Sequence, residues 1–278
     1  MIIRDILVYV DDSPASRPRV EAAVRLADRH QARIAGVFLR SAFQNTFWSA
    51  DAVSMTAAID VEAIVKDHDT AVATASETAR QMFEGVAGDA GVTSEWLVID
   101  GDADAPLVAL ARRFDLTVMP VKARPKLGEN VVTAAGVALA CGGPVLALPE
   151  SGYPQDLGRR VVVAWKNSRE SARALRDAWP LLAAAEEVHI VSVPEDGVLD
   201  PDSNLQRHFE RHGVKAKLIL TSGGALLLSD ALREQAAVLK ADLVVMGVYG
   251  RSRLSELVFG GVSGDLLARP PAPLLLSH

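Results

Sequence analysis

A group of glycines near the end of the chain has the spacing of a phosphate-binding loop. Residues 247–250 read GVYG after an apolar run, and residues 260–263 read GGVS at the start of a helix-like pattern. Glycine lets the backbone approach a ligand closely and adopt positive φ angles. Amides at the following helix N-terminus then face an anion, and the helix dipole adds attraction. Phosphate is therefore the ligand chemistry that this pattern favours.

Alternating strands and helices are predicted to position this loop. Continuous apolar runs, which indicate strands covered on both faces, lie near residues 4–10, 33–39, 93–99, 115–120, 144–148, 159–165, 187–193, 214–220, 242–247 and 273–277. Helical patterns lie near residues 15–30, 60–88, 104–113, 130–141, 169–184, 202–212, 225–239 and 261–268. With right-handed crossovers this order predicts an α/β fold of two tandem doubly wound (Rossmann-like) domains, each a five-stranded parallel sheet flanked by helices. Ligands of such sheets bind beyond the carboxyl ends of the strands, at the switch point.

The two sets of elements are copies of each other. The matching runs are ILVYV-DDS from residue 6 with VVVAW-KNS from residue 161, and DLTVM from residue 115 with DLVVM from residue 242. A repeat of this length indicates two whole domains, not a solenoid unit. We place them at residues 1–150 and 158–278, with a linker rich in turn-forming residues between them.

The sequence resembles the universal stress protein family, in its tandem form, over nearly all of its 278 residues. The resemblance rests on Asp11, on residues 241–247 (ADLVVMG), and on the spacing Gly, two residues, Gly, nine residues, Gly, then Ser or Thr. The resemblance implies that the glycine loop and the helix start bind the phosphates of ATP. It also implies that the Asp after the first strand contacts the nucleoside, and that the end of the second strand lies beside the adenine. The candidate nucleotide-binding set of the second half is Gly247, Gly250, Arg251, Gly260, Gly261, Val262, Ser263, Lys166 and, near adenine, Val193.

The second half departs from the family pattern at two positions. Gly261 stands at the Ser/Thr position, so a hydroxyl is missing, and Ser263 one turn inside the helix could partly replace it. Lys166 stands where the strand-one Asp belongs. An ammonium cannot accept a hydrogen bond from a ribose hydroxyl, but it could pair with phosphate, with Glu170 or with Glu195.

The first half departs in the opposite sense. It keeps Asp11, but Pro120 and the Thr-Ala pair at residues 133–134 replace the loop glycines. Proline donates no amide, and alanine resists positive φ angles. We therefore expect no phosphate cradle in the first half and at most one nucleotide site in the chain.

These observations predict a stress-response protein that binds ATP or a related nucleotide, with or without Mg²⁺, in its second domain. No catalytic residue is assigned, so we expect regulation and at most weak ATP hydrolysis. The alternatives are a nucleotide-free interaction scaffold, in which Lys166 fills the pocket, and a slow ATPase. By resemblance to single-domain relatives, residues 145–148 and 274–277 should pair antiparallel, so that the domains pair internally. A homodimer is compatible with the resemblance, and the sequence does not identify protein partners.

Composition excludes several other classes of protein. The net charge of −6 argues against a nucleic-acid partner, and no apolar run approaches the length of about 20 residues that spans a membrane. The N-terminus lacks the features of an export signal, so a cytoplasmic location is expected. Cys141 is the single cysteine, which excludes an intramolecular disulfide and a cysteine-cluster metal site; a buried apolar role is expected.

Two further features of the sequence are given structural interpretations. His208 and His212 share a helix face, but Phe209 breaks the zinc-protease pattern, so a solvated face and no metal are expected. The alternating acids Asp100, Asp102 and Asp104 are assigned to capping of the next helix.

Two other segments of the sequence each allow two interpretations. Arg251 and Arg253 beside the glycine loop either hold phosphate or a partner, or are exposed loop charges. Residues 41–59, rich in aromatic side chains, are assigned to a loop over their own domain, with a lid or partner surface as the alternative.

Overall fold

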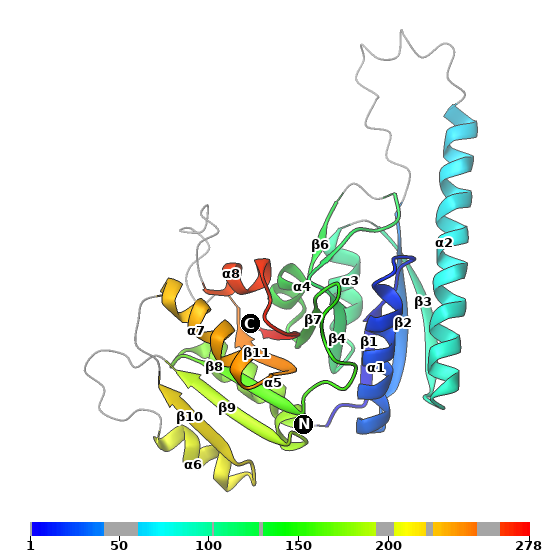
Figure 1. Cartoon of the computed structure of the whole chain (residues 1–278). Helices are drawn as coiled ribbons and strands as arrows, with labels where there is room; N and C mark the ends of the chain where they lie inside the picture. The colour runs from blue at the N-terminus through cyan, green and yellow to red at the C-terminus, as the bar shows by residue number, and fades with distance from the viewer. Residues whose placement is uncertain are drawn as a thin grey trace.

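All ten predicted strands lie in one continuous sheet (Figure 1). The computed structural model describes residues 2–41, 61–101, 103–127, 130–192, 203–220, 225–248 and 262–278. The strands of the sheet are β1 (Asp5–Tyr9), β2 (Arg33–Arg40), β3 (Ser94–Asp100), β4 (Leu116–Pro120), β7 (Val145–Leu148), β8 (Arg160–Trp165), β9 (Glu187–Ser192), β10 (Ala216–Leu220), β11 (Leu243–Gly247) and β12 (Leu274–Ser277). The helices are α1 (Ser16–His30), α2 (Val61–Asp89), α3 (Asp104–Ala111), α4 (Ala134–Cys141), α5 (Arg169–Ala183), α6 (Ser203–Arg211), α7 (Ala225–Val238) and α8 (Val262–Ala268).

Each half contributes five parallel strands to the sheet. The order across it is β10-β9-β8-β11-β12-β7-β4-β1-β2-β3. Within each half the chain first builds outward from a central strand, β1 or β8, and then crosses to its other side. These two crossovers create the switch points, between β1 and β4 and between β8 and β11, where doubly wound sheets bind ligands. The predicted α/β fold class is confirmed, while the exact domain boundaries stay a prediction.

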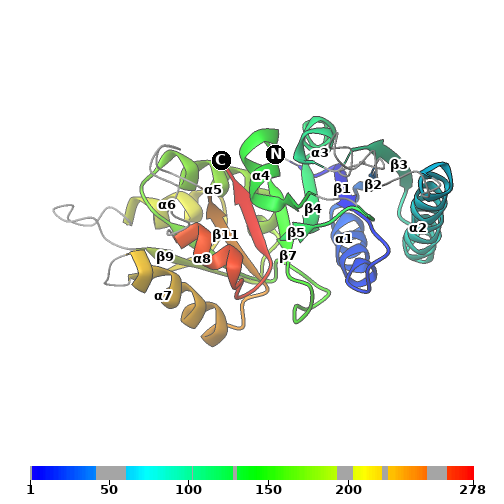
Figure 2. The same ribbon diagram turned by 90° about the horizontal axis from the view of Figure 1, so that it is seen from above.

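The halves join through one antiparallel strand pair, as predicted. β12 lies against β7 with Leu274 opposite Ala147, Leu275 opposite Leu146 and Leu276 opposite Val145. Figure 2 shows the two halves side by side along the sheet. Because the strands of one half run opposite to those of the other, the carboxyl ends of the two sets point in opposite directions.

Helices cover both faces of the sheet, which explains the uninterrupted apolar strands. In β1, Ile6 and Val8 pack with the helices of one face, while Leu7 and Tyr9 pack with those of the other. The first face is covered by α1, α2, α5 and α6, and the second by α3, α4, α7 and α8. No helix in the described ranges is long and apolar enough to cross a membrane.

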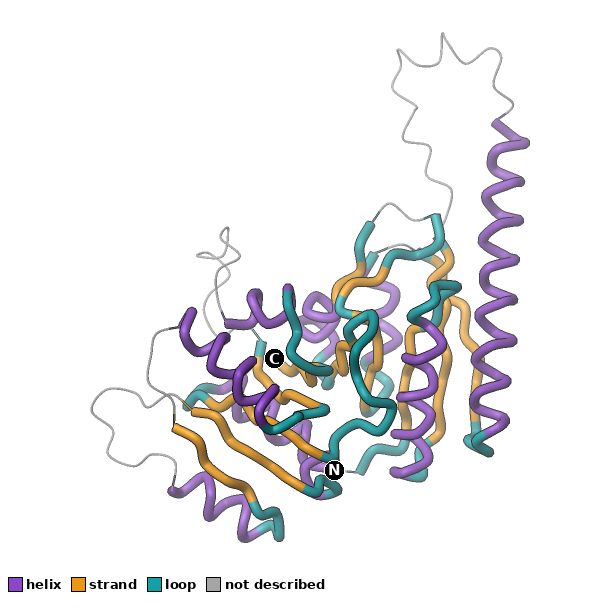
Figure 3. Tube along the Cα trace, in the orientation of Figure 1, coloured by secondary structure: helices purple, strands orange, loops and turns teal. Residues whose placement is uncertain are grey.

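A short hairpin corrects one predicted boundary. β5 (Lys122–Ala123) pairs antiparallel with β6 (Val132–Thr133), where the sequence predicted that a helix starts near residue 130. The helix begins at Ala134 because the Thr133 side chain accepts a hydrogen bond from the Gly136 amide and caps it. The long helix α2, at the right of Figure 3, lies at the outer edge of the first half, where it packs against β2 and β3.

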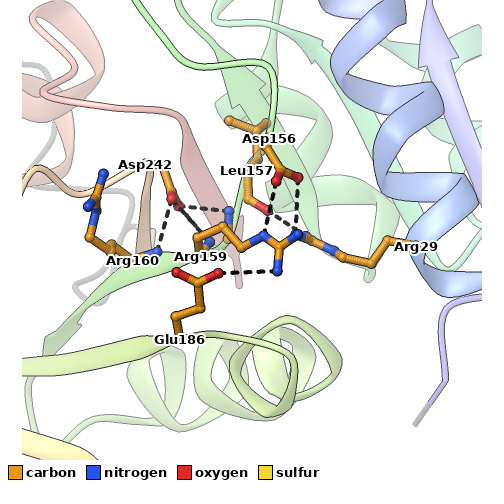
Figure 4. A network of polar contacts seen from close by, with 8 residues as sticks. Arg29, Asp156, Leu157, Arg159, Arg160, Glu186 and Asp242 are labelled. Atoms are coloured by element: carbon orange, nitrogen blue, oxygen red, sulfur yellow. Dashed lines mark hydrogen bonds and ion pairs between the residues drawn. The ribbon is translucent and has the colours of Figure 1, made fainter.

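The linker is fastened to both halves by a polar network (Figure 4). The Asp242 carboxylate accepts hydrogen bonds from the amides of Gly158 (2.7 Å), Arg159 (3.0 Å) and Arg160 (2.9 Å). From the first half, the Arg29 guanidinium donates to the Leu157 carbonyl. Burial raises the pKa of Asp242, and the three amides act in the opposite direction.

The same device recurs in the first half. Asp115, the repeat partner of Asp242, accepts hydrogen bonds from the amides of Arg4 (2.8 Å) and Asp5 (3.0 Å). Each Asp thus ties the start of strand β1 or β8 to the strand beside it. This explains the repeated Asp-Leu pairs without any ligand.

Candidate functional site

The candidate site of the second half lies where β8 and β11 end. A Cβ added to Gly247, at the end of β11, would lie 2.5 Å from the carbonyl carbon of Glu170 in the first turn of α5. Real side-chain atoms do not approach backbone that closely, so only glycine allows this helix to pack against the strand end. Gly247 is therefore required by the fold itself, before any ligand is considered.

Lys166 follows β8 and its side chain is exposed. Its amide donates to the Ser171 hydroxyl (3.3 Å), which fixes the turn from strand to helix. Among the described residues its ammonium forms no ion pair: Glu170 contacts Arg169 (3.2 Å) instead, and Glu195 is outside the described residues. The pKa of Glu170 is held below its usual value, first by its own backbone amide, then by Ser168 and the Arg169 charge.

The start of α8 lies where the sequence placed a phosphate-binding helix. Val262 is its first residue and Ser263, partly buried, its second. A Cβ added to Gly264 would meet nothing within 4 Å. No described residue therefore fills the space beside this first turn. Of the predicted nucleotide set, four residues are therefore located: Gly247, Lys166, Val262 and Ser263. Gly250, Arg251, Gly260, Gly261 and Val193 lie outside the described residues, as do Arg253 and nearly all of residues 41–59.

An ion pair from the first turn of α8 holds this helix on α7. Asp265 contacts Arg233 of α7 (2.7 Å) and Arg269 (3.0 Å). A hydrogen bond from Ser229, followed by the two guanidinium groups, holds the pKa of Asp265 well below its usual range. The contact between Asp265 and Arg233 thus fixes the position of α8 on α7.

The equivalent strand end in the first half is closed by a buried ion pair. Asp11 lies 3.1 Å from Arg19, whose side chain is only 2% exposed. The Arg19 Nε donates to the Tyr9 carbonyl (2.8 Å), and its guanidinium lies 5.7 Å from the centre of the Tyr9 ring. Asp11 also accepts a hydrogen bond from the Ser13 amide (3.0 Å). The carboxylate that the family resemblance assigns to a nucleoside is therefore committed to internal partners.

A carboxyl group of the protein occupies the helix start in the first half. Asp104 accepts a hydrogen bond from the Thr133 amide (3.2 Å). A Cβ added to Gly136, in the first turn of α4, would overlap the other Asp104 oxygen. Burial raises the pKa of Asp104, and the Thr133 amide acts in the opposite direction.

The expected capping role of the three alternating acids needs correction. The N-cap of α3 is Ala103, which makes no side-chain hydrogen bond. Asp104 is the first residue of α3, but its carboxylate accepts a hydrogen bond from the Thr133 amide at the start of the neighbouring helix α4. Asp100 pairs with Arg40 (2.6 Å), and Asp102 is outside the described residues.

The segment after β4 completes the closure of the first half. Lys126 reaches back to Asp12, with an Nζ–Oδ2 distance of 2.7 Å. Its carbonyl accepts a hydrogen bond from Ser41, which follows β2 and is 2% exposed. This segment therefore bridges the ends of β1 and β2, where the resemblance would place a nucleoside.

The remaining candidate residues fit structural roles. Cys141 is buried, burial raises its thiol pKa, and it borders a cavity of about 180 Å³ where the end of α4 meets α5. The charged residues of that cavity are partnered: Arg173 contacts Asp177 (2.9 Å), and Arg112 donates to the Ala140 carbonyl. In the part of the chain that the structure describes, no three His, Cys, Asp or Glu side chains gather as a metal site.

Three residues close the strand ends and helix start of the first half: sequence reasoning missed Arg19 and Lys126, and it assigned Asp104 to the wrong helix. One signal was available for Arg19, because it lies on the apolar stripe of α1 one residue before Val20. A charged residue is almost never fully buried unless it is paired. Asp104 and Lys126 act across distant segments, and no local pattern indicates their partners.

Comparisons with known proteins agree with this architecture. Residues 228–278 match a family model described as the universal stress protein family. A universal stress protein from Archaeoglobus fulgidus DSM 4304 superposes with a TM-score of 0.75 at 18% identity, covering 98% of this chain and 97% of the other. A putative universal stress protein from Pseudomonas aeruginosa UCBPP-PA14 gives 0.58 at 14% identity, covering 99% and 93%. No curated protein sequence matches the chain.

The fold and the repeated strand ends define a tandem α/β protein built from two doubly wound halves. Two solved structures that share this fold over nearly the whole chain bear the name universal stress protein, and residues 228–278 match that family's model. The resemblance expected from the sequence, in its tandem form, is confirmed.

Proposed function

We propose that the chain is a cytoplasmic stress-response protein that binds one molecule of ATP or a related nucleotide through its second half. The observation that supports this most is the difference between the two helix starts. The first turn of α4 is filled by the Asp104 carboxyl, whereas the space beside Gly264 in α8 is open toward the described residues. A helix N-terminus next to a switch point is suited to a phosphate group.

Lys166 supplies a positive charge to the proposed site. An exposed ammonium with no ion-pair partner among the described residues lies at the end of β8, the strand next to β11. A cation there suits an anionic ligand better than it suits ribose hydroxyls. We therefore assign Lys166 to the phosphates, with or without Mg²⁺. The located residues include no group poised as a general base, so the proposed role is sensing, with at most slow hydrolysis.

Calorimetry on the full chain with ATP and Mg²⁺ tests this function. We expect one nucleotide per chain, and a loss of affinity of at least tenfold, about 1.4 kcal/mol, in Gly250→Ala and in Lys166→Ala. Lys215→Ala, an exposed lysine after α6, serves as the matched control and should bind like the native protein. No heat at high micromolar nucleotide, or two nucleotides per chain, would refute the proposal.

A nucleotide-free scaffold is the second candidate, and one observation favours it. Gly247 is explained by the close approach of Glu170, so this glycine alone does not require a ligand. Native mass spectrometry of the purified protein separates the two functions, since a copurified nucleotide supports the first. A crystal structure grown without nucleotide, with the Lys166 ammonium inside the crevice, supports the second.

A further inference from the structure

Two histidines and a tryptophan form a cluster on the face of the sheet opposite to α8. His208 and His212 lie one turn apart, at the C-terminal end of α6, and Trp179 faces them from α5. The centres of the two imidazole rings are 4.7 Å apart. They lie 5.6 Å and 4.8 Å from the centre of the Trp179 ring system. We call the two imidazoles the His208–His212 pair.

Buried residues fix the orientation of this pair. Phe209 of α6 is fully buried, its ring centre lies 5.3 Å from that of Trp179, and Leu205 one turn earlier is also buried. The helix therefore cannot rotate without exposing its apolar face. Both histidines are nonetheless exposed to solvent, so an ion can reach them. The sequence predicted a solvated helix face, and the structure adds a tryptophan that packs against both rings.

The ring spacing matches two ligands of a single metal ion. A metal about 2.1 Å from one nitrogen of each ring would lie about 3.2 Å from each ring centre. With centres 4.7 Å apart, the two rings would subtend an angle of about 95° at the metal. The spacing of the ring centres therefore permits both imidazoles to bind one ion, and adjacent positions of a tetragonal copper(II) or nickel(II) ion have about this angle. Copper(II) also binds imidazole most tightly among these ions.

The surroundings of the His208–His212 pair carry positive charge. Burial, and then the charges of His212, Arg211 and Arg176, lower the pKa of His208. The same two arginines repel a cation at longer range, so the affinity should rise when salt screens them.

We propose that the His208–His212 pair binds one divalent transition-metal ion, copper(II) in preference, at a site separate from the nucleotide site. Among the described residues no third His, Cys, Asp or Glu joins the pair. Water completes the coordination sphere, and the ion stays open to exchange. Because the pair lies against Trp179, the fluorescence of that residue reports on binding.

Copper(II) titration of the untagged full chain, without nucleotide, tests the proposal by calorimetry and tryptophan fluorescence. We expect one ion per chain and saturable quenching. Electron paramagnetic resonance should show two imidazole nitrogens on the bound copper. His208→Phe and His212→Phe keep a ring against Trp179 but remove the nitrogen ligands, and each should lower the affinity at least tenfold.

Two controls separate binding from packing. Trp179→Phe should bind copper by calorimetry yet lose most of the quenching, and His278→Gln, at the far end of the second half, should behave like the native protein. If a phenylalanine variant does not fold, the exposed His212→Gln replaces it. Non-saturable heat, or unchanged affinity in the folded histidine variants, would overturn the proposal.

Discussion

The first turns of α4 and α8 occupy equivalent places in the two halves but meet different surroundings. In α4, Gly136 is pressed against the Asp104 carboxyl, and Thr133 caps the helix. In α8, Gly264 faces open space toward the described residues, and Asp265 is turned to Arg233. The helix start of the first half is therefore satisfied from within, whereas none of the described residues fills the space beside Gly264 in the second half. A few side chains, not the architecture, make the difference.

The residues that follow β1 and β8, at equivalent places in the two halves, also differ in their charged partners. Ser16 and Ser171 hold equivalent turns: the Ser16 hydroxyl accepts a hydrogen bond from the Asp11 amide (3.0 Å), and the Ser171 hydroxyl accepts one from the Lys166 amide (3.3 Å). Three residues further on, Arg19 corresponds to Ala174. The first half therefore keeps an acid with its buried cation, while the second has Lys166 and no buried partner for it at that position. Both positions of the charge pair therefore differ between the halves.

Breaking the Asp11–Arg19 pair should have the largest effect on stability. Arg19→Ala leaves a mostly buried carboxylate without its cation and removes a hydrogen bond to Tyr9. We expect the free energy of unfolding, measured in urea, to fall by about 3 kcal/mol.

The double variant Asp11→Lys with Arg19→Ala copies the second half into the first. It should recover at least half of that loss, because the uncompensated acid is gone. A single variant that costs under about 1 kcal/mol would show that the pair behaves as a surface ion pair.

Alanine at the two helix-start glycines should have effects of opposite sign. Gly136→Ala pushes against Asp104 and the Thr133 hydroxyl, so a loss of about 1–2 kcal/mol is expected. Gly264→Ala meets nothing among the described residues and should be neutral or stabilise by up to about 1 kcal/mol. Thermal or urea unfolding of the two variants measures the contrast, and equal losses would contradict it.

The smallest effect is a difference in pH dependence between the two helix acids. The pKa of Asp104 is raised on folding, so its contribution to stability is present below its unfolded pKa of about 4 and is lost as pH rises through the raised value. The pKa of Asp265 is lowered, so its contribution is present above about pH 4 and is lost as pH falls.

Relative to the native protein, Asp104→Asn should therefore lose most stability in acid, and Asp265→Asn most at neutral pH. Urea unfolding at about pH 3.5 and pH 7 gives both differences. Parallel pH profiles for the two variants would mean that the two acids do not differ in this way.

The fold could be predicted from the sequence because its signals are local. Strands buried on both faces must be apolar throughout, and each of the ten runs became a strand close to its predicted bounds. Even the antiparallel β7–β12 pair followed from the repeat and the family resemblance.

The hairpin of β5 and β6 was missed because two-residue strands carry no periodicity. The polar closure of the first half was missed for another reason. Asp104 meets Thr133 and Lys126 meets Asp12 only after the chain has folded, so their pairing is a tertiary property. The second half was partly predictable: α8 begins one residue from the predicted position, while Lys166 did not take Glu170 as its partner.

The β7–β12 pair also has a genetic consequence. In a dimer of identical chains, each substitution enters both subunits, so a change that closes one crevice closes the other as well. Here a single polypeptide supplies both strands of the junction. A mutation at Lys166 or at Asp104 therefore changes one half alone. The two halves of one chain can therefore carry different residues at equivalent places, as Asp11 and Lys166 do.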